Sequence, residues 1–219
     1  MSIQIKYKNE LNSFVSMQQV QGLKEYSKLT YYNNQLQQIE TLIPIRNGNK
    51  KTVEYFLSDD QVKESIIQGI INAVISDDKI TKFSLVIYFS KQIQHGFTSW
   101  DWEEYSVDKI LLSKGKSTYD AKNRLVFYCF FDLQTNALKK GAFKFYYGGK
   151  FDDENDDLLL KFNYYDNGEV ELVTDYNDFL GLHEAIYLDE FLYYENEFKW
   201  EDHPYYHSAY TILPNSPTV

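Results

Sequence analysis

A β-hairpin is most evident in residues 42–56, which read Leu42-Ile43-Pro44-Ile45-Arg46-Asn47-Gly48-Asn49-Lys50-Lys51-Thr52-Val53-Glu54-Tyr55-Phe56. Two runs rich in apolar and β-branched residues flank Asn47-Gly48, the dipeptide that most favours a two-residue type I′ turn. A two-residue loop at these positions pairs Leu42 with Val53 and Ile39 with Phe56. The segment therefore predicts two antiparallel strands.

Similar signals recur along the chain. Asn167-Gly168 predicts a second hairpin, which pairs Tyr165 with Val170 and Phe162 with Val173. Gly148-Gly149 predicts a third turn, placed between the run 142–147 and an acidic run. Segments 82–89 and 124–131 are almost continuously apolar, a pattern that favours central strands buried on both faces.

One amphipathic helix is predicted over about 59–76. Ser58 and Gln61 have the spacing of a capping box. Apolar residues then recur at helical spacing, at Val62, Ile66, Ile70, Ala73 and Val74. A second helix is suggested near 178–194, where Leu182, Ala185 and Ile186 favour a helix and Gly181 opposes it.

Composition favours the same fold class. The 219 residues include 20 Tyr and 15 Phe, and aromatic residues make up 17% of the chain. Aromatic side chains are favoured in strands, where the ring packs on the sheet. We therefore predict an α+β fold of mainly antiparallel hairpins packed with one clear helix. The length suits a single domain over 1–219.

Charge is distributed unevenly. Residues 1–150 hold 20 Lys and Arg against 15 Asp and Glu, whereas residues 151–219 hold 2 against 17. This contrast suggests a weak subdivision near residue 150. The acidic part retains aromatic residues, which acidic disordered tails lack, so we expect it to be folded. Its charge repels nucleic acid and anionic membranes and attracts a basic protein partner.

The compartment follows from cysteine content and hydropathy. Cys129 is the only cysteine, so an intrachain disulfide is excluded, and its apolar neighbours predict a buried thiol. The first ten residues lack the apolar stretch of a signal peptide, and no apolar run approaches the roughly 20 residues of a membrane span. We expect a cytoplasmic protein.

Two stretches are candidate partner-binding sites. The first concentrates two tryptophans and three carboxylates in Trp100, Asp101, Trp102, Glu103 and Glu104. It reads either as a recognition loop, because Trp dominates interface hot spots, or as core tryptophans. The second contains Asp152, Asp153, Asp156 and Asp157, in a run that lacks the glycine and distal glutamate of a calcium loop.

Catalytic and cofactor motifs are absent from the sequence. Gly115-Lys116-Ser117-Thr118 resembles the end of a phosphate-binding loop, but Ile110 stands where that motif needs a glycine. His203 and His207 would share one face of a helix and could hold a metal, yet Pro204 argues for an extended segment. We predict no cofactor and no metal. A hydrolase or metal-binding enzyme that uses carboxylates with these two histidines is the alternative.

Three short segments repeat one pattern, an aromatic residue, a turn rich in Asx or Gly, and an aliphatic residue. They are Tyr31-Tyr32-Asn33-Asn34-Gln35-Leu36, Tyr119-Asp120-Ala121-Lys122-Asn123-Arg124-Leu125 and Tyr164-Tyr165-Asp166-Asn167-Gly168-Glu169-Val170. The pattern resembles YD-type and MORN-like tyrosine-hairpin repeat proteins, which are often found in bacterial toxin–immunity loci. The resemblance implies a binding or structural protein without catalytic residues.

The functional hypothesis is therefore a non-enzymatic, cytosolic interaction protein. Its acidic, aromatic surface would bind a basic protein partner by electrostatic steering and aromatic anchoring. An immunity protein that neutralises a cationic toxin is the sharpest version of this hypothesis. A structural hairpin-repeat protein is a further alternative.

Overall fold

The computed structural model describes residues 2–77, 79–148, 158–176, 179–181, 185–193 and 198–214. These residues form one sheet of 13 strands, in the order β13-β12-β11-β10-β9-β8-β7-β6-β5-β4-β3-β1-β2. From β3 to β13 each strand lies beside its neighbour in sequence, as expected for a chain of hairpins. The sheet is mainly antiparallel, which confirms the predicted α+β fold class.

The chain divides into two compact units, each described here by itself. Unit 1 comprises Met1–Ser90 and Trp102–Ser113, and unit 2 comprises Lys91–Asp101 and Lys114–Val219. Three long strands contribute residues to both units, namely β6 (Ile80–Gln94), β7 (Phe97–Tyr105) and β8 (Leu111–Tyr119). The change of charge near residue 150 falls inside unit 2.

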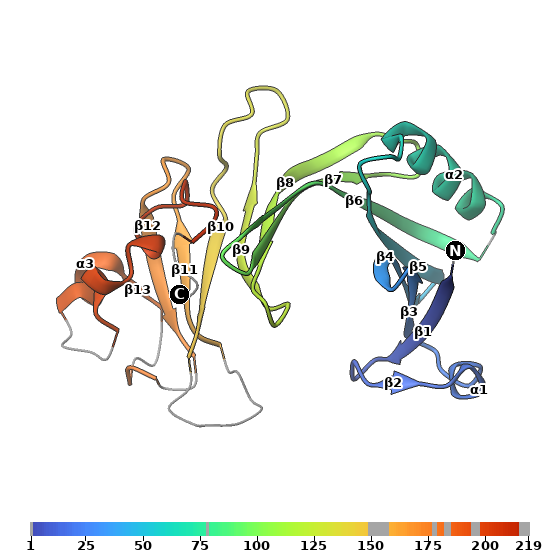
Figure 1. The fold of residues 1–219 in the computed structure, drawn as a ribbon, viewed down its shortest axis with the longest axis horizontal. Coiled ribbons are helices and arrows are strands. Elements are labelled where there is room, and N and C mark those ends of the chain that lie inside the picture. Colours follow the sequence, from blue (N-terminus) through green and yellow to red (C-terminus); the bar gives the residue numbers. More distant parts are fainter. Residues whose placement is uncertain are drawn as a thin grey trace. The chain divides into compact units, whose positions relative to one another are not determined.

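Unit 1 begins with antiparallel strands in the order β2-β1-β3-β4-β5 (Figure 1). Its elements are β1 (Ile3–Asn9), β2 (Phe14–Val15), α1 (Met17–Val20), β3 (Tyr26–Tyr32), β4 (Gln35–Ile45), β5 (Gly48–Phe56) and α2 (Lys63–Ile75). A capping box between Ser16 and Gln19 closes the N-terminus of α1, which satisfies two backbone donors in a helix of one turn.

The hairpin of β4 and β5 forms, but in a register shifted by two residues from the prediction. Leu42 pairs with Lys51 and Ile39 with Glu54, and the two-residue loop is Arg46-Asn47. Gly48 is the first strand residue, with φ +129°, and a Cβ there would lie 2.6 Å from Cγ2 of Thr81. Position 48 therefore needs a glycine because Thr81, at the start of β6, approaches it closely. The glycine is not part of the two-residue loop itself.

Helix α2 covers one face of the sheet in unit 1 (Figure 1). Ile67 and Ile71 pack with Val53, Leu85 and Ile87, and Ile71, Leu85 and Ile87 are fully buried. Each such side chain contributes about 1.5–3 kcal/mol of burial free energy. The inward face therefore centres on Ile67, Ile71 and Val74. Val74 is buried as predicted and Ile66 and Ile70 pack at the margin of the cluster, whereas Val62 is 61% exposed.

The helix also begins later than predicted, at Lys63 instead of residue 59. The capping-box residues Ser58 and Gln61 do contact each other, with the Ser58 N–H donating to Oε1 of Gln61 at 3.0 Å. The same Gln61 side chain donates through Nε2 to the Tyr55 hydroxyl at 2.8 Å. Gln61 thus fastens the loop to β5, and the helix starts one turn further on.

Strands β5 and β6 are parallel, with Val53 opposite Leu85 and Tyr55 opposite Ile87. Two parallel neighbours need a crossover connection, and α2 supplies it. This βαβ unit was not predicted, because the turn residues that mark a hairpin do not indicate which strand the chain pairs with after a helix. The predicted central strand 82–89 lies in β6, and 124–131 corresponds to β9 (Leu125–Phe130). In β9 alternate residues such as Tyr128 are only half-buried.

Unit 2 continues the antiparallel order with β9, β10 (Ala142–Tyr147), β11 (Leu158–Tyr164), β12 (Val170–Asp175) and β13 (Ile186–Tyr187). Three short helical segments follow, α3 (Leu188–Tyr193), η1 (Trp200–Asp202) and η2 (Pro204–His207). In the described part of 178–194, the predicted helix is replaced by a two-residue strand followed by a helix of six residues. No helix in the described part of the chain is long and apolar enough to cross a membrane.

The hairpin at Asn167-Gly168 forms as predicted in its body but not at its end. Phe162 pairs with Val173, as expected, whereas Val170 pairs with Tyr164 instead of Tyr165. The shift arises from an extra residue on β12, a β-bulge at which Glu171 has no cross-strand partner in the ladder. The third predicted turn, at Gly148-Gly149, falls outside the described residues from Gly149 onward.

One buried row crosses five strands of unit 2. Phe127 lies opposite Lys144, Lys144 opposite Phe162, Phe162 opposite Val173, and Val173 opposite Ile186. All five face the main core of this unit, which also contains Cys129. The thiol is buried, as predicted, and burial raises its pKa to about 11. It therefore behaves as a small apolar side chain.

Candidate functional site

The last described residues, 198–214, close the core of unit 2, and we call them the C-terminal strap. Phe198, Tyr205, Tyr206 and Ala209 belong to the same buried cluster as Phe162. The ring centroids of Phe162 and Tyr206 lie 4.7 Å apart. Figure 1 shows the strap beside β10 and β12.

Side chains of the sheet hold the strap by its backbone carbonyl groups. Lys144 Nζ donates to the oxygens of Tyr205 and Ser208, the latter at 2.7 Å. The Tyr164 hydroxyl donates to the oxygen of Tyr206 at 2.7 Å. Thr118 Oγ1 donates to the oxygen of Ile212 at 3.1 Å. These bonds satisfy carbonyl groups that a segment without regular structure would otherwise bury unpaired.

Lys144 is the most unusual group in this arrangement, because its side chain is completely buried. Its ammonium lies 3.8 Å from the ring centroid of Tyr205, a cation–π contact that partly replaces lost hydration. Burial lowers the pKa of Lys144 well below the usual value of 10.5. The residue ties the strap to the centre of β10 and so fixes the surface around it.

Unit 2 carries a set of exposed tyrosines and carboxylates on a turn, on an edge of the sheet and on the strap. We call it the acidic tyrosine surface, and it comprises Tyr165, Asp166, Glu169, Tyr187, Asp189, Glu190, Tyr193 and Tyr210. These residues come from the turn between β11 and β12, from β13 and α3 at the edge of the sheet, and from the strap. Tyr193 is 91% exposed, Tyr210 63% and Tyr187 58%.

Lys140 connects two parts of this surface. Its Nζ lies 2.5 Å from Oε1 of Glu171 and 5.6 Å from the ring centroid of Tyr165. The Glu171 carboxylate raises the pKa of Lys140, and Tyr165 and Tyr187 act in the same direction. Both tyrosines are therefore near one cation. The carboxylate of Glu171, at the bulge, pairs with Lys140. The four carboxylates of the acidic tyrosine surface are exposed to solvent.

The β11–β12 turn is joined to the strap by a close contact. Gly168 has φ +82°, and a Cβ there would lie 2.4 Å from Cε2 of Tyr210. The Ala209 N–H also donates to the oxygen of Gly168 at 2.9 Å. Glycine accepts this positive φ without strain and lets the Tyr210 ring approach the turn this closely. The contact brings Tyr210 to the same turn as Tyr165, Asp166 and Glu169.

The first predicted partner-binding stretch lies in strand β7, and not in a recognition loop. Trp102 is 2% exposed, so its ring belongs to the interior. Trp100 is half-buried, with the Lys91 ammonium 5.3 Å from its ring centroid. A strand forms here because its side chains alternate between buried and half-buried positions from Phe97 to Trp100.

The carboxylates of the same stretch are engaged inside the protein. Asp101 pairs with Lys116. Glu103 pairs with Lys63 at 2.7 Å and accepts a hydrogen bond from the Tyr105 hydroxyl. Glu104 accepts hydrogen bonds from the hydroxyls of Ser84 at 2.6 Å and Ser113 at 2.7 Å. These partners compete with any cation that a binding protein would offer.

The second predicted stretch, with Asp152, Asp153, Asp156 and Asp157, lies outside the described residues. Of the rest of the acidic part, the structure describes residues 158–176, 179–181, 185–193 and 198–214. Eight of its aromatic residues are in the buried core or pack against it, namely Phe162, Tyr164, Phe179, Phe191, Phe198, Trp200, Tyr205 and Tyr206. These described portions of residues 151–219 are folded, as their aromatic content predicted.

The two histidines that could have formed a metal site are packed against aromatic rings. His203 stacks on Phe198 with centroids 4.2 Å apart, and burial lowers its pKa. His207 stacks on Trp200 at 4.3 Å, and its Nε2 lies 2.8 Å from the Trp200 oxygen. Among the residues with described positions, no three His, Cys, Asp or Glu side chains gather closely enough to hold a metal ion.

Sequence reasoning did not single out Tyr187, Tyr193 and Tyr210. The segment that contains Tyr193 reads Leu188-Asp189-Glu190-Phe191-Leu192-Tyr193. Two carboxylates precede Phe191, which is the one buried residue of this helix. A helix this short buries one side chain and exposes the rest. The longer helix predicted near 178–194 did not distinguish these positions.

Comparisons with known proteins add no family to this picture. No protein-family model matches the chain. No curated protein and no solved structure matches it either. What the acidic tyrosine surface does must therefore be inferred from its own chemistry.

Proposed function

We propose that this protein is a non-enzymatic interaction protein that binds a basic protein partner through the acidic tyrosine surface of unit 2. The observation that carries the proposal is the exposure of Tyr187 and Tyr193 next to the exposed carboxylates of Asp189 and Glu190. Tyrosine is enriched at interface hot spots because it buries a large ring and keeps a polar tip.

The charge of the chain supports a basic partner. The formal net charge is −10, and residues 151–219 carry 17 acidic side chains against 2 basic ones. Carboxylates that face solvent raise the local concentration of a cationic protein and speed its association. Asp166, Glu169, Asp189 and Glu190 are exposed in this way.

The tyrosines would supply slow dissociation, which charge steering alone does not provide. An exposed ring that becomes desolvated against a partner contributes to slow dissociation, and a hot-spot ring contributes about 2 kcal/mol or more. Tyr193 has almost its whole side chain available for such a contact. Trp100 remains a further candidate contact, whereas the burial of Trp102 leaves its ring no surface to offer.

Among basic partners, a cationic toxin such as a nuclease is the one to test first. Carboxylates placed opposite the toxin's substrate-binding cations would block the site by charge and by bulk. The tyrosine-hairpin resemblance of the sequence points to the same class of partner. The role would be that of an immunity protein, which acts in the compartment where the toxin would do harm, here the cytoplasm.

The experiment is affinity capture from the native host with chemical cross-linking and mass spectrometry. The wild type is compared with a variant that carries Asp189→Asn, Glu190→Gln, Tyr187→Ala and Tyr193→Ala. The matched control is Glu10→Gln with Asp59→Asn, which removes two exposed charges from unit 1.

We expect one basic protein to be enriched by the wild type and by the control, and lost with the surface variant. Cross-links should fall within residues 158–214. An acidic captured protein, or capture that survives the surface variant, would contradict the proposal. If the captured protein is a toxin, a stoichiometric amount of this chain should abolish its activity.

A further inference from the structure

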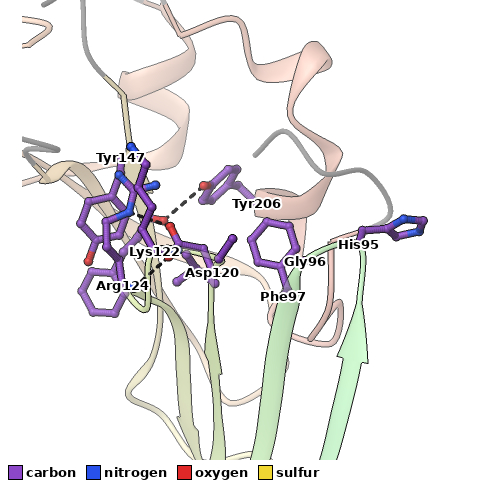
Figure 2. Close-up of a pocket in the computed structure, with 11 residues that line it drawn as sticks. His95, Gly96, Phe97, Asp120, Lys122, Arg124, Tyr147 and Tyr206 are labelled. Atoms are coloured by element: carbon purple, nitrogen blue, oxygen red, sulfur yellow. Dashed lines mark hydrogen bonds and ion pairs between the residues drawn. The ribbon is translucent and has the colours of Figure 1, made fainter. Parts of the chain in front are cut away.

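The pocket of unit 2 drawn in Figure 2 has polar groups that the protein itself satisfies. The Tyr206 hydroxyl donates to the oxygen of Phe145 at 3.2 Å. Oδ1 of Asp120 accepts hydrogen bonds from the backbone N–H groups of Lys122 and Arg124, at 3.0 and 2.8 Å. An edge of unit 1 differs from this pocket, because backbone groups there have no ladder partner in the described part of the chain.

Strand β1 is covered unequally on its two sides. Towards β3 all 7 of its residues pair. Towards β2 only Tyr7 and Lys8 pair. Strand β2 then ends at Val15 and the chain turns into α1, so residues 3–6 form a free sheet edge among the described residues. A free edge of this kind is a template to which another strand can be added.

The outward backbone groups of this edge belong to Ile3 and Ile5. In an antiparallel ladder, successive residues direct their N–H and C=O groups to opposite neighbours. The Asn9 N–H donates at 3.0 Å to the oxygen of Ser13, which directly precedes β2. Odd-numbered residues of β1 therefore face the side of β2. The N–H and C=O groups of Ile3 and Ile5 accordingly lie along the free edge.

A groove of about 550 Å³ adjoins the same edge. Its walls include Ile5 and Lys6 of β1, Phe14 of β2 and Met17 at the start of α1. Ile5, Phe14 and Met17 are 48%, 61% and 67% exposed. The groove can therefore take apolar side chains of a strand that lies along β1.

Lys6 and Lys8 give the edge its charge. The Lys6 ammonium lies 5.0 Å from the Tyr31 ring centroid, and that of Lys8 lies 5.0 Å from the Phe14 centroid. Lys8 also donates to Oδ1 of Asn12 at 2.9 Å. Neither lysine has a carboxylate at ion-pair distance among the described residues. An aromatic ring attracts a cation without cancelling its charge, so this edge is complementary to a carboxylate.

We infer that the free edge of β1 binds an extended acidic segment of a partner protein by strand addition. The segment runs antiparallel to β1, in line with β2, and its backbone bonds to Ile3 and Ile5. Side chains opposite these two residues are apolar, and a carboxylate opposite Lys6 faces its ammonium. The recognised sequence is therefore acidic, apolar, any residue, apolar, read from its N-terminus.

The charge of β1 decides between a partner segment and a second copy of this chain. Strand β1 contains two lysines and no carboxylate, so a second β1 lacks the charge that this edge would attract. The site belongs to unit 1, and its existence does not depend on the acidic tyrosine surface.

Synthetic peptides test the backbone geometry and the charge. The parent peptide is acetyl-Glu-Val-Thr-Val-Thr-amide, and binding is followed by isothermal titration and by the amide NMR shifts of β1. N-methylation of either valine should weaken binding at least about tenfold, because each valine N–H faces β1 and loses its acceptor. N-methylation of the threonine between them should leave affinity within about twofold, since that N–H faces away from β1.

A peptide with lysine in place of glutamate tests the charge. It should bind about fivefold more weakly at 0.1 M salt, and the difference should shrink at 1 M. Loss of affinity that does not alternate along the peptide, tighter binding of the lysine peptide, or no binding of the parent up to about 5 mM would each overturn the inference.

Variants of the protein test the assigned residues. Ile5→Pro removes the outward N–H and keeps the bonds of the even-numbered residues to β3, and it should weaken binding of the parent about tenfold. Lys6→Gln should weaken it about threefold. Lys82→Gln, which removes an exposed cation of unit 1 outside the groove, should leave it unchanged. Unchanged affinity in Lys6→Gln and in a folded Ile5→Pro would overturn the inference.

Two further controls keep the test decisive. Circular dichroism checks the folding of each variant, and the N-methylated peptides with the wild type decide if Ile5→Pro unfolds. Sedimentation velocity measures self-association of the wild type. Dimerisation that Ile5→Pro abolishes, together with no peptide binding, would assign the edge to a second copy and overturn the inference.

Discussion

The Nζ of Lys144 lies 2.7 Å from the backbone oxygen of Ser208, 64 residues further along the chain. The same ammonium bonds to the oxygen of Tyr205 and lies over the ring of that residue. One buried cation thus joins the centre of β10 to the C-terminal strap. Because the strap carries Tyr210 and closes the core under β11 to β13, this link also supports the acidic tyrosine surface.

The buried Lys144 predicts how stability depends on pH. Its folded pKa lies below the unfolded value of 10.5, so just below pH 10.5 the unfolded chain holds a proton that the folded chain has lost. The free energy of unfolding should therefore rise with pH, by at most about 1.4 kcal/mol per pH unit from this group. Lys144→Met should remove that rise.

Urea unfolding of both proteins between pH 7 and about 9.5 measures the difference. The window ends there because burial raises the pKa of Tyr164 and Tyr206 above 10, and their ionisation lowers stability at higher pH in both proteins. The gap in unfolding free energy between wild type and Lys144→Met should change in favour of the wild type as pH rises. Parallel pH curves would show that Lys144 keeps an ordinary pKa.

Tyr164→Phe should loosen the strap. The substitution removes the donor to the Tyr206 oxygen and leaves that buried carbonyl unpaired, at a cost of about 1–3 kcal/mol. Amide hydrogen exchange in residues 204–212 should become faster, as followed by mass spectrometry. Tyr176→Phe is the control, since Tyr176 is 38% exposed. Unchanged protection in Tyr164→Phe would mean that the strap is held by packing alone.

Two glycines should respond to alanine with opposite signs. Gly69 lies within α2, and a Cβ there meets nothing within 4 Å, so Gly69→Ala should stabilise the protein by about 1 kcal/mol. Gly48→Ala should destabilise it by about 1–3 kcal/mol, because φ is +129° and the new Cβ would meet Thr81. Thermal unfolding of the two variants tests both expectations. If Gly48→Ala stabilised the protein instead, Thr81 could not approach position 48 as closely as the structure shows.

Local chemistry made much of the sheet predictable from sequence. Asn47-Gly48 and Asn167-Gly168 both mark real hairpins, and Gly168 supplies the positive φ that its turn requires. Register was less predictable, since β12 holds a bulge at Glu171 and Gly48 is approached closely by Thr81, a residue distant in sequence. The parallel pairing of β5 with β6 likewise depends on tertiary packing, which local sequence patterns do not indicate.

The candidate surface was predictable in its charge but not in its residues. Asp189 and Glu190 belong to an acidic part that stands out in the sequence, whereas the exposure of Tyr193 depends on where α3 ends. Trp102 looks like an interface residue by composition and is buried by β7. Lys144 shows the converse, because a lysine is expected at the surface and only its cross-strand neighbours Phe127 and Phe162 reveal its burial.

The most direct test of the proposed function is the kinetics of binding to the captured partner at about 0.1 M and 1 M salt. Asp189→Asn with Glu190→Gln should slow association at the lower concentration and have little effect at the higher, where the Debye length falls to about 3 Å. Tyr193→Ala should instead speed dissociation about thirtyfold at both, equivalent to about 2 kcal/mol. Association that accelerates with salt, or dissociation that is unchanged in Tyr193→Ala, would contradict binding through the acidic tyrosine surface.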